Sequence, residues 1–178
     1  LIAEKEGASV TRSDPGRGIQ CNRGARQAQG AILVFLHADT RLPENAFQII
    51  DSCFSDPKVM IGTFRLRFDF DHILLRVSGY CTRFDSILTR FGDQCIVVRR
   101  VFFDELGGFP EWQLFEDVDL LRRARGKTKI YSFPAEVTTS ARKFRKNGVV
   151  KQQLRNGILL IKYLTGLPVK QLAKEYQR

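Results

Sequence analysis

Ala31-Ile-Leu-Val-Phe-Leu-His37-Ala-Asp39-Thr-Arg-Leu-Pro43 is the stretch that decides the fold of this chain. Its six apolar residues, rich in Ile, Leu, Val and Phe, predict a strand that is buried on both faces. Ligands of open α/β sheets bind beyond the carboxyl ends of such strands, which puts Asp39 where a metal-bound phosphate would be met. Asp39 can equally cap the turn before a helix that begins near Pro43. The stretch alone leaves both interpretations open.

Length and composition indicate one folded domain. The chain has 178 residues, and 43% of them are hydrophobic, which suits a globular protein with one sizeable core. Its four cysteines are widely spaced and form no CxxC pair, which argues against a zinc site or a disulfide framework and favours a cytoplasmic location. No apolar run reaches the roughly 18 residues that a membrane-spanning helix requires.

Charge is unevenly distributed along the chain. The net charge is +10, and residues 141–178 hold ten Lys and Arg against one acidic residue, Glu175. Such a tail can meet nucleic acid, an anionic membrane or a phosphate-bearing substrate, or it can be a solvated basic face. A basic nucleic-acid-binding module is therefore one alternative. Because no RNP, helix-turn-helix or zinc-finger pattern is present, we expect no nucleic-acid partner.

The order of expected elements indicates a mixed α/β fold, because helical spacing alternates with short apolar or alternating runs. The expected strands are 8–11, 31–36, 60–70, 95–98 and 129–133. The expected helices are 1–6, 19–29, 43–54, 72–90, 100–106, 116–125 and 148–165. We expect one mixed α/β domain over residues 1–147 and a basic helical extension over residues 148–178.

Two further segments carry residue types suited to phosphate chemistry. The loop Gly16-Arg17-Gly18, with Asn22 and Gly24 behind it, offers backbone donors, a guanidinium and an amide near a helix start. It matches neither a Walker loop nor a dinucleotide fingerprint, and the residues alone favour a tight turn with a surface arginine. In Phe115-Glu116-Asp117, adjacent acids begin an expected helix, where a carboxylate can cap the helix or act as a general base.

The ordered set of these motifs resembles the family 2 glycosyltransferases of the GT-A fold. The chain is similar in particular to the bacterial subgroup labelled arsenosugar-biosynthesis-type glycosyltransferases. The stretches that carry the resemblance are Gly16-Arg-Gly18, Asn22-x-Gly24, Leu36–Pro43, Phe64–Phe68, Gly92-Asp-Gln94, Gly107-Gly-Phe109, Phe115-Glu-Asp117 and Thr139–Arg142. The resemblance spans essentially the whole chain. It implies a Rossmann-like, nucleotide-diphospho-sugar transferase fold with a mixed sheet flanked by helices.

The resemblance also implies a metal and a donor. Family members hold the donor diphosphate through a divalent metal, with an Asp-x-Asp signature at a strand end. Asp39 matches the second acid and His37 stands in the first position, which implies Mn²⁺ or Mg²⁺ at these two residues, although Mg²⁺ prefers oxygen ligands. By the same resemblance, a UDP- or GDP-type sugar donor is bound by Arg17, Asn22, Gly24, Asp39 and Arg142.

For the reaction, the resemblance makes Asp117 the general base of an inverting transfer. It removes the acceptor's proton as the acceptor oxygen attacks the anomeric carbon. The residues implied on the acceptor side are Gly92, Asp93, Gln94 and Glu116. Neither the sugar nor the acceptor follows from the sequence.

Family members begin with two strands that hold the nucleotide, and this sequence starts after them. The resemblance therefore implies a sheet that is truncated at its amino-terminal end and an incomplete donor pocket. We expect weak binding of nucleotide sugars and an exposed sheet edge that favours association, including a homo-oligomer. A non-catalytic GT-A remnant is the alternative to an active enzyme.

The expected helix at 148–165 is amphipathic. Its apolar stripe consists of Val150, Leu154, Ile158, Ile161 and Leu164. Packing of this stripe against the domain is the favoured interpretation. The alternative is a helix that lies on an anionic membrane, which would make the protein peripheral at the inner face of that membrane.

Overall fold

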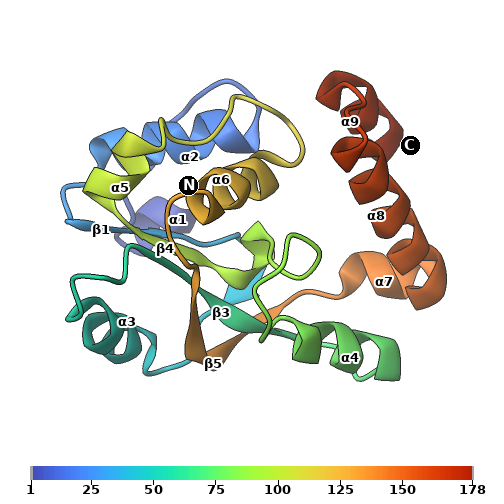
Figure 1. Ribbon diagram of the computed structural model, residues 1–178, viewed down its shortest axis with the longest axis horizontal. Helices are drawn as coiled ribbons and strands as arrows, with labels where there is room; N and C mark the ends of the chain where they lie inside the picture. The colour runs from blue at the N-terminus through green and yellow to red at the C-terminus, as the bar shows by residue number, and fades with distance from the viewer. Residues whose placement is uncertain (1, 178) are drawn as a thin grey trace.

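A mixed five-stranded sheet forms the centre of the molecule (Figure 1), as seen in a computed structural model that describes residues 2–177. The strands are β1 (Ile32–Phe35), β2 (Thr40–Arg41), β3 (Ile61–Phe68), β4 (Ile96–Arg99) and β5 (Tyr131–Thr139). They are ordered β1-β4-β3-β5-β2 across the sheet. The pair β3 and β5 is parallel, whereas β4 is antiparallel to both of its neighbours. Strands β1, β3 and β5 therefore run in the same direction.

Helices cover both faces of the sheet. They are α1 (Ile2–Lys5), α2 (Arg17–Gln27), α3 (Ala46–Phe54), α4 (Ile73–Cys81), α5 (Arg100–Glu105), α6 (Glu116–Arg125), α7 (Arg142–Asn147), α8 (Val149–Leu164) and α9 (Val169–Gln177), with a 3₁₀ turn, η1, at Gly92–Gln94. Figure 1 shows α2, α5 and α6 on one face and α3 on the other. The expected α/β class is confirmed.

The two faces of the sheet carry separate cores, as the period of two along a strand requires. Ile96 and Val98 of β4 pack with residues of α5 and α6, such as Phe102 and Leu120. Val97 between them faces the opposite way, toward Phe64, Phe133 and α3. This explains why three consecutive residues of β4, Ile96, Val97 and Val98, are all apolar.

Two sequence expectations about strands are wrong. The strand expected at 31–36 was to be buried on both faces, but β1 pairs with β4 alone, and Val34 and Leu36 are 36% and 41% exposed. Residues 8–11 form no strand. Among the described residues, no strand supplies hydrogen bonds on the free side of β1, so this side is an open sheet edge.

Local chemistry accounts for two other boundaries. The helix expected over 72–90 ends at Cys81, because the hydroxyl of Thr82 donates to Gly79 O (2.6 Å) and accepts from Leu66 N (2.9 Å). The strand expected at 129–133 continues to Thr139 through Pro134. The register with β3 shifts at this proline, and such a bulge accommodates a residue that has no N–H to donate.

The carboxy-terminal helices pack on the rest of the molecule with an unexpected orientation. Leu159 of α8 and Leu172 of α9 form a small core with Leu114. The predicted apolar stripe of α8 points the other way: its five side chains are 44–62% exposed. The favoured expectation, that this stripe packs against the domain, is therefore wrong. No helix within residues 2–177 is long and apolar enough to cross a membrane.

Candidate functional site

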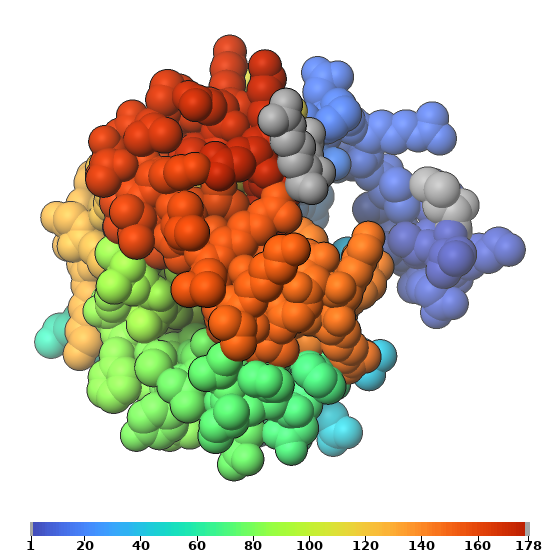
Figure 2. All heavy atoms as spheres, turned by 90° about the vertical axis from the view of Figure 1, so that its right-hand side faces the viewer, coloured from blue at the N-terminus to red at the C-terminus, as the bar shows by residue number. Residues whose placement is uncertain are grey.

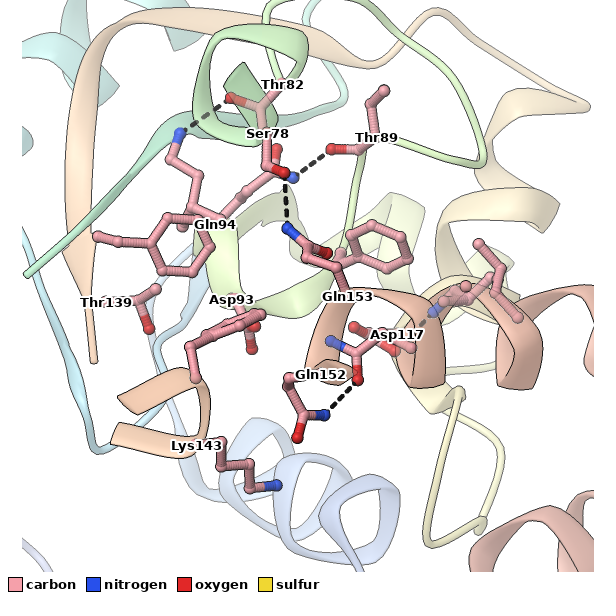
Figure 3. A pocket seen from close by; sticks show the side chains of 18 of the residues that line it. Ser78, Thr82, Thr89, Asp93, Gln94, Asp117, Thr139, Lys143, Gln152 and Gln153 are labelled. Carbon is pink, nitrogen blue, oxygen red and sulfur yellow. Dashed lines mark hydrogen bonds between the residues drawn. The ribbon is translucent and has the colours of Figure 1, made fainter. Parts of the chain in front are cut away.

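A cavity of about 530 Å³ lies beyond the carboxyl ends of strands β1, β3 and β5. Because these three strands run in the same direction, the segments after them and the η1 turn before antiparallel β4 meet at this end of the sheet. Phe68 and Thr139, at the ends of β3 and β5, line the cavity. Figure 3 shows Asp93, Asp117, Lys143 and Gln152 around it.

Seven of the residues that the sequence implicated line this cavity. They come from α2, the end of β1, η1, α6 and α7, and they are Arg17, His37, Asp39, Asp93, Gln94, Asp117 and Arg142. No single sequence motif is long enough to contain all seven of them. The fold thus brings together side chains that the sequence supplies from five separate segments.

Asp117 is fixed at the cavity wall by backbone donors. Its Oδ2 accepts a short hydrogen bond from Gly92 N, and its Oδ1 accepts from Val118 N at 2.8 Å. The residue is 9% exposed and lies in the first turn of α6, where free N–H groups and the helix dipole stabilise a negative charge. The carboxylate is therefore held in one orientation.

The backbone around Asp117 is strained at two positions. Phe115, which precedes α6, and Cys95, which follows η1, have φ angles of 63° and 58°. Non-glycine residues adopt this left-handed region at a cost, and such strain is concentrated at functional sites. The Phe115 ring stacks on Tyr163 of α8 with 4.7 Å between ring centroids. This packing holds the turn that presents Asp117.

His37 forms a pair with Asp93. The two side chains are 2.9 Å apart, measured from Nδ1 to Oδ1. The hydrogen bond that His37 donates to Asp93 raises the pKa of His37, although partial burial of the imidazole opposes its charge. A Cβ at Gly92 would lie 2.9 Å from Asp117 Oδ2 and 3.1 Å from His37 Nε2. Because residue 92 has no side chain, His37 and Asp117 can both lie close to its backbone.

Glu116 lies beneath the cavity and does not line it. It is 2% exposed, its Oε1 is 3.6 Å from Arg17 Nη1, and its Oε2 has no hydrogen-bond partner within the described residues. Burial and the neighbouring Asp117 carboxylate raise the pKa of Glu116 to about 7, against an opposing effect of Arg17. Glu116 therefore lies next to Arg17 outside the cavity lining, and its carboxylate does not face an acceptor in the cavity.

We expect Glu116 to make folding stability fall as pH rises from about 4.5 to about 7. In this range the unfolded chain has released the proton that the folded chain retains, so the folded state binds more protons. The effect levels off above pH 7 and amounts to about 3 kcal/mol. Urea unfolding across this range should show a clearly smaller loss in Glu116→Gln than in the wild type, with His37 contributing a remaining fall near the upper end of the range. The exposed Glu111→Gln is the matched control, and equal pH profiles for wild type and Glu116→Gln would contradict the assignment.

Asn22 and Gly24 are placed elsewhere than the resemblance implies. The Asn22 side chain donates to Phe109 O (2.8 Å) and accepts from Phe109 N (2.9 Å), so it joins α2 to the segment before α6. Gly24 lies at a separate hollow between α2 and residues 9–13. Gln94 lines the cavity, but its amide donates to Thr89 O, which gives it a supporting role.

The metal set implied by the resemblance fits in part. No group of three or more His, Cys, Asp or Glu able to hold a metal occurs within residues 2–177. The Nδ1 atom of His37 is already paired with Asp93, so this atom is not free to bind a metal. Asp39 is exposed at the cavity, and within residues 2–177 its carboxylate forms no hydrogen bond or ion pair. One free carboxylate suits Mg²⁺ or Mn²⁺ that completes its shell with water and substrate phosphates.

Sequence reasoning missed the carboxy-terminal part of the cavity wall. Lys143 of α7, Gln152 and Asn156 of α8 and Tyr176 of α9 line the cavity. Gln152 is 3% exposed and bonds to Asn147 (2.6 Å) and Asn156 (2.7 Å). The sequence feature that indicates this part of the wall is the pair of amides, Gln152 and Asn156, which stand one turn apart on the face of α8 opposite the apolar stripe.

Neither models of known protein families nor curated proteins give a match to this chain.

Proposed function

We propose that this protein is a metal-assisted glycosyltransferase that transfers a sugar, with inversion, from a nucleoside diphosphate sugar to an acceptor hydroxyl. The observation that carries the proposal is the fixed carboxylate of Asp117 in a cavity that also contains Arg17, Arg142 and Lys143. A base and a set of cations in one cavity suit a reaction that releases a diphosphate. The motif resemblance supports the same class.

Asp117 is the general base of the proposed reaction. The acceptor hydroxyl gives its proton to the Asp117 carboxylate while its oxygen forms a bond to the anomeric carbon. The bond from that carbon to the diphosphate breaks, and its electron pair leaves with the diphosphate. Attack from the side opposite the leaving group inverts the configuration. The Gly92 and Val118 N–H groups hold Asp117 in position throughout.

The cations of the cavity bind the donor and stabilise its departure. Arg17 is half exposed and reaches the cavity from the first residue of α2. Arg142 and Lys143 reach it from α7. Guanidinium and ammonium groups at a developing phosphate charge lower the barrier because that charge grows in the transition state.

Asp39 is the residue that would hold the metal in this proposal. A divalent cation supplies positive charge to the leaving diphosphate and needs few protein ligands when substrate phosphates complete its shell. His37 is assigned a different part: its pairing with Asp93 orders the turn next to Asp117.

The proposal predicts hydrolysis of UDP- or GDP-sugars, supplied at high concentration with Mn²⁺, in which water takes the place of the acceptor hydroxyl and nucleoside diphosphate is released. Excess chelator should abolish the release, and Asp39→Asn should raise the Mn²⁺ concentration needed for half the maximal rate. Glu44→Gln, at an exposed acid five residues after Asp39 that does not line the cavity, is the matched control and should leave the Mn²⁺ dependence unchanged. Absence of release from every donor would overturn the proposed activity. Release that is equal with chelator would overturn the role of metal.

A further inference from the structure

The exposed face of α8 is an apolar surface that the described chain leaves uncovered. Leu154, Ile158 and Ile161 are 62%, 51% and 60% exposed. At 3.6 residues per turn they stand in one row with Val150 and Leu164, so the stripe extends along the whole helix. Single exposed apolar side chains are ordinary, but a continuous row of them marks an interaction surface.

Helix α4 extends this surface. Ile73, Val77 and Tyr80, spaced at helical intervals, are 65%, 52% and 58% exposed. The hydrogen bond from Gln153 of α8 to Ser78 Oγ of α4 (2.7 Å) joins the two helices beside these rows. Figure 2 looks onto this side of the molecule, where green α4 and orange-to-red α7 and α8 make one continuous face.

Unpaired cations border the apolar rows. Arg76 lies beside the exposed row of α4, on the side away from Ser78. Lys151 lies beside the α8 stripe, on the side away from Gln153. Lys146 of α7 is exposed close by. None of these three side chains forms an ion pair or hydrogen bond within residues 2–177. Helices α4, α7 and α8 contain no acidic residue, and the single acid of α9, Glu175, is bound to Lys162 at 2.6 Å.

We propose that the exposed face of α4 and α8 docks on the surface of an anionic lipid bilayer. A row of large apolar side chains enters the boundary between headgroups and acyl chains, while lysine and arginine at its border meet anionic headgroups. A second copy of this chain fits less well, because helices α4, α7 and α8 would bring the same unpaired cations together and contain no acidic residue themselves. The proposal does not depend on glycosyl transfer.

Docking in this way puts the cavity beside the membrane. Val77 is part of the docking face and also lines the cavity, as does the exposed Leu88. Gly157, which stands in the exposed row of α8, lines it too. The cavity therefore borders the face that would lie on lipid, which suits an acceptor with a membrane anchor if the proposed function holds.

The test is flotation of the whole chain with vesicles of phosphatidylcholine alone or mixed with phosphatidylglycerol. The wild type should float with the anionic vesicles. The double variant Leu154→Glu/Ile158→Glu should lower the partition coefficient by about 100-fold, because two inserted apolar side chains are lost. Arg76→Gln/Lys151→Gln should lower it by about 30-fold on anionic vesicles and leave neutral vesicles unaffected.

The matched control is Phe47→Glu/Val101→Glu, which makes the same change at side chains that are 65% and 69% exposed on α3 and α5. Figure 1 shows these helices away from α4 and α8. Circular dichroism should confirm that all variants fold. The proposal is overturned by a wild type that does not float with anionic vesicles, or by a stripe variant that floats as the control does. It is also overturned by a wild-type dimer that the stripe variant dissociates without any vesicle binding.

Discussion

Asp117→Asn should reduce the rate of nucleoside diphosphate release by about 10²–10⁴-fold, the range that a positioned general base contributes. The amide cannot accept the acceptor's proton, yet it retains the size of the carboxylate and the contact with Gly92 N. We expect the loss in kcat and little change in donor binding, because Asp117 acts on the acceptor hydroxyl. Steady-state rates with saturating donor measure the first, and calorimetric titration of the donor measures the second.

Asp119→Asn separates the chemical effect from any loss of stability. Asp119 lies on the same helix, is 6% exposed and bonds to Arg122 (2.9 Å) and Arg123 (2.8 Å), but it does not line the cavity. Both variants lose hydrogen bonds, and we expect each to lower the free energy of unfolding by about 1–3 kcal/mol. A rate that falls equally in both would remove Asp117 from the role of base. Full activity in Asp117→Asn with loss in Glu116→Gln would transfer that role to Glu116.

The part of the site that the sequence predicted consists of residues directly attached to strand ends and helix starts. Asp39 follows an apolar run, and Asp117 begins a helix with an acid in its first turn. Such positions can be placed because ligands of α/β sheets gather at the carboxyl ends of strands. The parallel direction of β1, β3 and β5 then brings them to one cavity.

The remaining features of the site and the fold depend on which surface each side chain contacts. The periodicity of the sequence does not contain that information. Periodicity predicts the stripe on α8 but not its direction, because an apolar face of a helix can point to a core or away from it. Burial of Leu159 and Leu160 on the other face decides the orientation. Asn22 resembled a ligand of phosphate, and only its two hydrogen bonds to Phe109 reveal a structural role.

Strand pairing was similarly hidden. Pro134 ends a strand in any local interpretation, yet β5 passes through it because a bulge against β3 requires no N–H there. Residues 8–11 have the composition of a strand and form none, since a strand needs a partner that supplies hydrogen bonds. Both outcomes are set by distant segments, which a local pattern does not describe.

Gly92→Ala should reduce the rate of transfer by about 100-fold while the chain remains folded. The new Cβ would lie 2.9 Å from Asp117 Oδ2, closer than such atoms approach, and a tight 3.1 Å from His37 Nε2, so the Asp117 carboxylate or the backbone at residue 92 must move. A displacement of about 1 Å in a catalytic group is enough for a loss of this size. Overpacking should also lower the free energy of unfolding by about 1–3 kcal/mol, measured by urea unfolding.

Gly126→Ala is the matched control, at the opposite end of α6 from Asp117. Its Cβ would meet nothing nearer than Arg123 O at 3.4 Å, an ordinary contact, and its φ of −67° suits alanine. Rates should be unchanged there, and stability should rise by about 0.4–1 kcal/mol because the unfolded chain loses freedom. Wild-type activity in Gly92→Ala would mean that the close approach of residue 92 does not align Asp117. A rate loss in Gly126→Ala equal to that in Gly92→Ala would attribute the effect to α6 as a whole.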